Sequence, residues 1–160
     1  MSDQSGTERP VADLYPTTTP EAQPFWDALS AGELRLQRCP DTGRLIFPPT
    51  PTSPFGRHLA PEWVAVSGRG RIWSFVVPHP PLMRQFADAA PYVSVLVELD
   101  EDPSVRLPGP LVAASGAPLG SVPASQVAIG QAVEIDIPNP SGGNVSAPRW
   151  ILSGDPARRT

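Results

Sequence analysis

The chain has 160 residues, of which 40% are hydrophobic and 18% are charged, a composition that suits one compact domain with a small extension and excludes a disordered chain. Its formal charge is -4 and all of its 12 basic residues are arginine, so the sequence offers no basic stripe for a nucleic-acid backbone. The 23 prolines and 13 glycines favour short strands over long helices.

The sequence also shows neither a membrane-span pattern nor a secretory-signal pattern. No apolar run approaches the roughly 20 residues of a membrane span. The opening stretch MSDQSGTERPVADLYP has neither the basic nor the apolar region of a secretory signal peptide. Cys39 is the single cysteine and cannot form an internal disulfide. We therefore expect a cytoplasmic protein without membrane spans.

A short helix is expected near the start of the chain. Residues 1–18 are polar and punctuated by proline, which indicates a tail. The next segment, 19–32, carries helix signals: Thr19 suits the N-cap, Pro20 the first helical position and Gly32 the position just past the end.

Phe25 and Trp26 give this helix a strongly apolar side. Two interpretations stay open: this side packs on its own domain, or an aromatic-rich helix near a loose terminus docks on another subunit. Under the second interpretation Phe25, Trp26 and Phe55 are the candidate interface residues, because aromatic side chains are favoured in buried interface cores.

The stretch GELRLQRCPDTGRLIFPP predicts a strand, a turn and a second strand, with Leu34 and Leu36 alternating against Arg35 and Gln37. The turn is CPDTG. After a proline-rich crossing, the residues from 53 to 56 form a second small turn.

A series of short strands fills the rest of the chain. Gly68 and Gly70 fit a tight turn or bulge between the first two of them. Roughly five strands with variable loops and little helix suit a small barrel of the OB type. The expected strands are 63–66, 70–77, 92–99, a short one near Val105, and one each in GPLVAAS, AIGQAVEIDIP and PRWILSG.

Between about Pro24 and Leu152 the chain resembles the family of zinc-ribbon OB-fold proteins that accompany thiolases and other acyl-CoA enzymes. The stretches that carry this resemblance are FWDALSAGELRLQRC, GRLIFPP, EWVAVSGRGRIWSF, PYVSVLVELDE and IGQAVEI, in this order and spacing. The resemblance implies a helix, then a rubredoxin-like ribbon that holds zinc through two Cys-x-x-Cys knuckles, then the OB barrel.

Aligned on those stretches, the zinc-ligand positions of the family fall here on Cys39, Thr42, Ser53 and Gly56. Structural zinc takes four ligands of the cysteine or histidine type. One thiolate remains, and His58, two residues past the last position, makes a poor site with it. We therefore expect no bound zinc and no other cofactor.

A ribbon without its metal must be held together in another way, because a structural zinc contributes on the order of 10 kcal/mol to the folding of isolated fingers. Five prolines between residues 48 and 61 restrict the unfolded chain. Phe47, Phe55, Leu59 and Trp63 are expected to form an apolar cluster where the metal was. The frame would then survive because its outer surface is an interface.

The sequence thus predicts a mainly β protein: an OB-fold barrel preceded by a short helix and a rubredoxin-like ribbon that lacks its metal ligands. The expected organisation is a tail at 1–18, the helix at 19–32, the ribbon lobe at 33–62, the barrel at 63–153 and a tail at 154–160.

Catalytic constellations are sparse. His79 in VVPHPPLMRQF lies in a candidate loop at the barrel mouth, and with Arg84 and Phe86 it is a candidate contact for acyl-CoA or another substrate. A surface histidine beside prolines is the alternative. A general base needs a carboxylate and a nucleophile within reach, and none is evident, so we predict no catalytic residue. The acidic turn at 100–103 is expected to be solvated, and Cys39 a leftover ligand.

Three functions stay open. The resemblance implies an accessory subunit that docks on a thiolase-like, aldolase-type or hydratase-like partner and helps to complete an acyl-CoA site, in some complexes for steroid side chains. An OB barrel also permits single-stranded nucleic-acid binding, which the charge of -4 disfavours. The third is a stand-alone enzyme with His79 as base.

Overall fold

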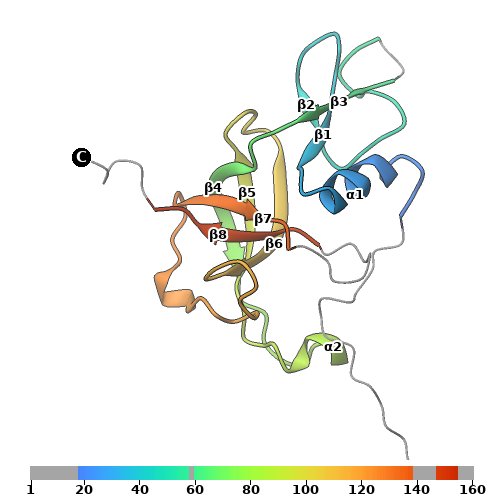
Figure 1. The fold of residues 1–160 in the computed structure, drawn as a ribbon. Helices are drawn as coiled ribbons and strands as arrows, with labels where there is room; N and C mark the ends of the chain where they lie inside the picture. Colours follow the sequence, from blue (N-terminus) through green and yellow to red (C-terminus); the bar gives the residue numbers. More distant parts are fainter. Residues whose placement is uncertain (1–17, 58–59, 139–146, 155–160) are drawn as a thin grey trace, which may run out of the picture.

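A computed structural model of the chain describes residues 18–57, 60–138 and 147–154, except for the side chains of Arg84 and Gln85 (Figure 1). Its strands form two sheets, a closed barrel in the order β4-β5-β6-β8-β7 and a three-stranded sheet in the order β2-β1-β3. The small sheet contains β1 (Arg35–Arg38), β2 (Leu45–Ile46) and β3 (Glu62–Ala65), and the barrel contains β4 (Arg69–Val76), β5 (Ser94–Leu99), β6 (Arg106–Val112), β7 (Ala132–Asp136) and β8 (Arg149–Leu152).

The barrel follows from the alternation of its strands. In β5 every second side chain is buried, so Val95, Val97 and Leu99 point into the interior. All pairs of barrel strands are antiparallel except β6 and β8, which run parallel and bring Leu111 opposite Trp150. Trp150 is fully buried and fills the interior. The predicted mainly β fold with an OB barrel is confirmed.

Closure of the barrel needs one very close strand contact. Gly70 in β4 faces β5, and a Cβ atom there would overlap the carbonyl oxygen of Glu98. A register shift follows between Ile72 and Ser74, which bends the long strand β4 around the barrel. The glycine is therefore required by the approach of the two strands.

The helix α1 (Gln23–Ser30) ends as predicted but begins later. Gly32 has a φ of 79° and donates to Leu29, and Glu33 donates to Ala28, which is the Schellman arrangement at a helix end. The N-cap prediction for Thr19 is wrong. Its carbonyl instead closes a preceding turn by accepting the N–H groups of Ala22 and Gln23.

One core runs through both sheets. Phe25 and Leu29 of α1 are buried with Leu36 and Leu45 of the small sheet, and these residues belong to the same cluster as the barrel interior. The helix packs beside β1, and we call α1 with β1–β3 and their turns the ribbon lobe (Figure 1). A second short helix, α2 (Arg84–Ala87), which was not predicted, lies at the far end of the barrel from this lobe (Figure 1).

Within the described residues no helix has both the length and the apolar character that a membrane span requires.

Candidate functional site: the ribbon turns and their joint with the barrel

The turn between β1 and β2 keeps the backbone of a metal knuckle. The N–H of Cys39 donates to the carbonyl of Arg44, and the N–H of Gly43 donates back to the carbonyl of Cys39, both at 2.8 Å. Gly43 has a φ of 71°, which glycine adopts without strain. Cys39 is fully buried at the centre of this turn.

The structure brings three of the four former ligand positions together. The side chains of Ser53 and Thr42 and the backbone of Thr42 and Asp41 lie around the thiol of Cys39. Hydrogen bonding from these groups, that of Ser53 first, lowers the pKa of Cys39 against the opposing effect of burial.

The fourth position is filled by a neighbour. A Cβ atom on Gly56 would overlap the carboxylate of Asp41 and stand 2.9 Å from its Cγ. The same carboxylate accepts the backbone N–H of Arg57. A side chain at position 56 therefore has no room while Asp41 keeps this place.

These residues do not fit a zinc ion. Of the four positions, Cys39 is the only one with a ligand of the type that structural zinc uses, since Thr42 and Ser53 carry hydroxyls and Gly56 carries no side chain. Among the described residues there is no group of three or more His, Cys, Asp and Glu side chains that could hold a metal ion. His58, the other residue considered at the sequence level, lies outside the described residues, as does Leu59.

The described members of the expected apolar cluster, Phe47, Phe55 and Trp63, have different surroundings. Phe47 packs on Phe25, with 5.7 Å between the ring centroids, and Trp63 packs against the common core. Phe55 is 37% exposed, and the guanidinium of Arg44 lies 4.0 Å from its ring centroid. Of the expected cluster, Phe47 and Trp63 therefore belong to the common core, and Phe55 lies at the surface.

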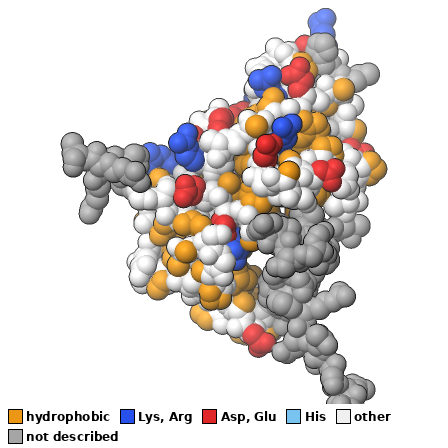
Figure 2. All heavy atoms as spheres, viewed as in Figure 1, with side chains coloured by type: hydrophobic (Ala, Val, Ile, Leu, Met, Phe, Trp, Pro, Cys, Tyr) orange, Lys and Arg blue, Asp and Glu red, His pale blue; other side chains and the backbone are white. Residues whose placement is uncertain are grey.

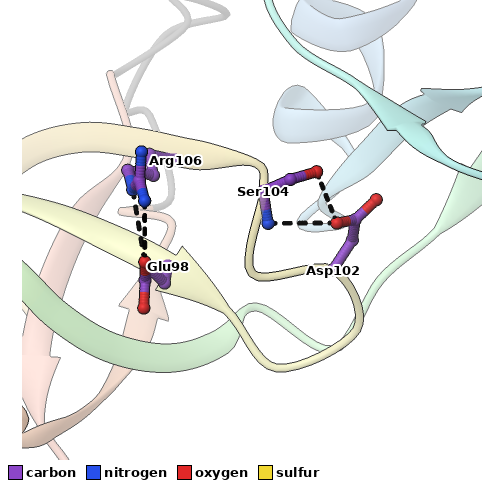
Figure 3. A network of polar contacts seen from close by, with 4 residues as sticks. All are labelled: Glu98, Asp102, Ser104 and Arg106. Atoms are coloured by element: carbon purple, nitrogen blue, oxygen red, sulfur yellow. Dashed lines mark hydrogen bonds and ion pairs between the residues drawn. The ribbon is translucent and has the colours of Figure 1, made fainter. Parts of the chain in front are cut away.

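The acidic turn at residues 100–103 is exposed at Asp100, Glu101 and Pro103, as the prediction of a solvated turn requires, but two of its carboxylates also join the barrel to the ribbon lobe. Asp102 accepts the backbone N–H of Leu45 in β2 through Oδ2 at 3.0 Å. Its Oδ1 accepts both the N–H and the hydroxyl of Ser104, at 3.0 and 2.6 Å (Figure 3). Glu101 accepts the N–H of Ser67 in the link between β3 and β4 at 2.6 Å.

Both carboxyl groups of this joint have lowered pKa values. Burial raises the pKa of Asp102, but the hydrogen bonds from Ser104 and Leu45 and the positive charge of Arg44 outweigh it. For Glu101, burial is likewise outweighed by the hydrogen bonds from Ser67 and by the charge of Arg69. The two groups are therefore held as carboxylates at neutral pH.

A pocket of about 190 Å³ opens at the same joint. The cation–π pair of Arg44 and Phe55 forms part of its wall. Its other lining residues include Leu45, Phe47 and Pro54 from the ribbon lobe and Ser104 and Val105 from the barrel.

The predicted substrate contacts lie in the connection between β4 and β5, at the end of the barrel far from the ribbon turns (Figure 1). The exposed His79 has its Nδ1 2.8 Å from the carbonyl oxygen of Val77, so Nδ1 carries the proton in this contact. Phe86 is half-buried and pairs with Tyr92. The side chain of Arg84 lies outside the described part.

The three interface candidates differ in exposure. Phe25 is 4% exposed and packs inside its own chain, so the first interpretation of the helix holds for this residue and its role as a docking residue is wrong. Trp26 is half-buried and meets Phe25 edge to face. Phe55 keeps an exposed face.

A second exposed aromatic residue was not predicted. Trp73 on β4 is 44% exposed, and the guanidinium of Arg106 lies 4.0 Å from its ring centroid. Glu98 accepts a hydrogen bond from Arg106 at 3.0 Å and fixes its position (Figure 3). On the face shown in Figure 2, acidic, basic and hydrophobic side chains are interspersed, and no broad basic patch gathers over the described residues.

Two family profiles match this architecture. One, described as the rubredoxin-like zinc ribbon domain of ChsH2, matches residues 26–52, and the other, the C-terminal OB-fold domain of ChsH2, matches residues 63–137. The chain belongs to the ChsH2-type zinc-ribbon and OB-fold family. The match to the ribbon profile ends before Ser53, so it includes only the first of the two ribbon turns.

Relatives of this ChsH2-type chain include subunits of two hydratases. It is 38% identical over 133 residues to the 3-oxo-4,17-pregnadiene-20-carboxyl-CoA hydratase alpha subunit of Mycobacterium tuberculosis, covering 81% of this chain and 39% of that subunit. It is 36% identical over 78 residues to a probable enoyl-CoA hydratase alpha subunit of Thermomonospora curvata, covering 48% of this chain and 24% of that one. The chain thus spans well under half the length of these relatives.

Among solved structures, the one described as the Ltp2-ChsH2(DUF35) aldolase superposes with a TM-score of 0.67 and 25% identity, covering 86% of this chain and 98% of that chain. A protein of unknown function of the DUF35 family from Sulfolobus solfataricus superposes with a TM-score of 0.52 at 13% identity, over 87% and 90% of the two chains, and supports the fold alone.

Sequence reasoning missed Asp41 and Asp102 as the residues that organise the site. Both lie two residues before a residue type that is common in turns: Asp41 before Gly43 in CPDTG, and Asp102 before Ser104 in DEDPS. The Asp-x-Ser spacing at 102–104 is the signal of a turn closed by an aspartate side chain, and it could have identified Asp102 as more than a solvated charge.

Proposed function

We propose that this chain is an accessory subunit of an acyl-CoA-processing complex, in which it docks on a thiolase-like, aldolase-type partner that carries out the bond cleavage. The observation that carries the proposal is the likeness to the Ltp2-ChsH2(DUF35) aldolase, which extends over 98% of that chain. The substrate class is the CoA thioester of a steroid or another acyl side chain, in keeping with the name of the Mycobacterium tuberculosis relative.

The residues of this chain agree with a supporting role. His79 donates to the backbone of its own loop, and the described carboxylates at the joint are engaged in holding backbone N–H groups. A chain of this kind contributes a rigid surface, and the partner contributes the nucleophile and base. His79, Phe86 and Arg84 are the candidate contacts to the acyl-CoA, and Phe55 and Trp26 the candidate contacts to the partner.

Co-expression with an aldolase-type protein encoded beside this chain tests the proposal. The expected result is a stoichiometric complex by light scattering, together with cleavage of a β-hydroxyacyl-CoA that neither subunit achieves alone. A chain that stays monomeric with the partner present, or that turns over an acyl-CoA by itself, would overturn it. In the second case His79→Ala would show whether the stand-alone enzyme uses this histidine.

A hydratase partner is the second candidate, because both curated relatives are alpha subunits of hydratases. The same co-expression with a hydratase-like protein separates the two. Hydration of an enoyl-CoA by the pair, with no aldol cleavage in the parallel experiment, would favour the hydratase.

A further inference from the structure

We infer that the ribbon lobe of this chain has exchanged the metal centre of its family for a metal-independent clasp, and that Asp41 is the residue that excludes a fourth ligand. The clasp is defined as the side chains of Cys39, Asp41, Thr42 and Ser53. This inference concerns how the lobe holds its shape, and it goes beyond the proposed function.

The clasp links the same two turns that a metal would link. Ser53, in the second turn, lies beside the thiol of Cys39 in the first. Asp41, in the first turn, accepts the backbone N–H of Arg57 at the end of the second. Both contacts join the turn at residues 39–43 to the turn at residues 53–57. Each therefore replaces part of the link between these two turns that four metal bonds supply in a zinc ribbon.

Two further contacts hold the second turn against the first. Arg44 lies 4.0 Å from the ring centroid of Phe55 and covers it. Gln37 in β1 is 4% exposed and exchanges two hydrogen bonds with the backbone of Thr50, at 2.9 and 2.8 Å. The crossing between the turns is therefore anchored at its beginning by an amide and at its end by a cation–π pair.

The neighbours of the Cys39 sulfur do not suit a metal. At two of the former ligand positions these neighbours are the hydroxyl side chains of Thr42 and Ser53, which structural zinc does not use as ligands. The sulfur is also fully buried, so solvent does not compete with these neighbours.

Asp41 and Gly56 form an exclusive pair. A Cβ at position 56 would overlap the Asp41 carboxylate, so the chain accommodates either the carboxylate or a side chain there, but not both. Gly56 is not among the glycines with a positive φ. Position 56 therefore requires glycine because the Asp41 side chain takes the place of a Cβ atom there, and not because of an unusual backbone conformation. This contact accounts for the absence of a side chain at this former ligand position.

Metal content and stability of the unmodified chain give the first test. Chain purified without chelator is expected to contain far less than one zinc per molecule, and its Tm is expected to be the same with EDTA and with added zinc. Stoichiometric zinc, or a Tm that falls with EDTA and returns with zinc, would overturn the inference.

Single substitutions test the clasp itself. Ser53→Ala and Asp41→Ala are each expected to lower the Tm by several degrees, and added zinc is not expected to restore it. Thr52→Ala is the matched control, because it removes an exposed hydroxyl one residue away. If Ser53→Ala and Asp41→Ala leave the Tm where Thr52→Ala leaves it, the clasp contributes nothing and the inference fails.

Rebuilding the metal site tests the exclusion. A variant with Thr42→Cys, Ser53→Cys and Gly56→Cys is expected not to bind zinc stoichiometrically. The same variant with Asp41→Gly, which also removes the Asp41 Cβ that would lie 2.8 Å from a Cβ at position 56, is expected to bind one zinc per chain and to gain thermal stability from it. Equal zinc binding with Asp41 retained would contradict its role. If the triple variant does not fold without metal, both variants are refolded in the presence of zinc, and equal zinc content in the two refolded chains contradicts the role of Asp41.

Discussion

The carboxylate of Asp102, on the turn between β5 and β6, accepts the backbone N–H of Leu45 in β2 at 3.0 Å. The two residues are 57 positions apart in the sequence, and one belongs to the barrel and the other to the ribbon lobe. Ser104 donates two hydrogen bonds to the other carboxylate oxygen, so the Asp102 side chain is oriented by its own turn as well as by Leu45. The position of the lobe on the barrel thus depends on the carboxylates of this turn as well as on the shared core.

Substituting Asp102 should loosen this joint. We expect Asp102→Ala to lower the free energy of unfolding by about 1–3 kcal/mol, because the part-buried N–H of Leu45 loses its acceptor. Urea unfolding measures the loss, and amide hydrogen exchange at Leu45 locates it. Asp100→Ala is the matched control, since its exposed side chain carries the same charge on the same turn. Equal effects of the two substitutions would show that the joint adds nothing.

The same carboxylate predicts a pH dependence. The pKa of Asp102 is lower in the folded chain than its ordinary value of 3.8, because hydrogen bonds and Arg44 outweigh the effect of burial. A group with a lowered folded pKa contributes its full stability above the unfolded pKa and loses it as the pH falls through the folded pKa.

We therefore expect the difference in unfolding free energy between the unmodified chain and Asp102→Asn to be constant above about pH 5 and to shrink as the pH falls below about 4. Urea unfolding of both proteins over this range measures it. A difference that persists unchanged in acid would mean that the charge of Asp102 does not contribute to the joint.

The elements that sequence predicted are those whose signal is local. The apolar run around Val95 and Val97 predicted a strand there, and Gly32 marked the helix end through the backbone conformation that it adopts. The start of α1 was misplaced because Thr19 suits a turn as well as an N-cap, and the tertiary position of the helix decided between them.

The site residues were harder to predict because their partners are distant in sequence. Asp41 meets Arg57 across 16 positions and Asp102 meets Leu45 across 57. An aspartate in a turn is common enough that its type alone carries no information about such a partner. The resemblance found the former ligand positions, yet it could not show that a carboxylate fills the place of the fourth.

A buried ion pair between the neighbouring barrel strands β7 and β8 gives a third prediction. Arg149 donates to Asp136 at 2.8 Å and to the carbonyl of Ala117 at 3.0 Å, and the side chains of Arg149 and Asp136 are 17% and 6% exposed. Arg149→Ala would leave the Asp136 charge buried without its partner. We expect a loss of about 3–5 kcal/mol in the free energy of unfolding.

The matched control for this pair is Arg35→Ala, which removes the partner of Glu33 in a pair whose side chains are 47% and 54% exposed. Exposed pairs of this kind contribute less than about 1 kcal/mol. Chemical denaturation of both variants provides the comparison. Losses of similar size would mean that the Asp136 charge is neutralised or solvated when Arg149 is removed.

The last prediction concerns the proposed partner. Phe55 lies on the second ribbon turn, keeps 37% of its surface exposed and is held in place by Arg44, so its ring is a rigid aromatic anchor of the kind that dominates interfaces. If the ribbon lobe docks on an aldolase-type subunit, Phe55→Ala should weaken the complex at least about tenfold while it changes the stability of the isolated chain by no more than about 1 kcal/mol. Ile129→Ala is the control, because Ile129 is 68% exposed and lies on the barrel just before β7. Affinity measured by interferometry, with thermal unfolding of the free chains alongside, separates docking from folding: an affinity that falls equally for both variants, or for neither, would place the interface elsewhere on the chain.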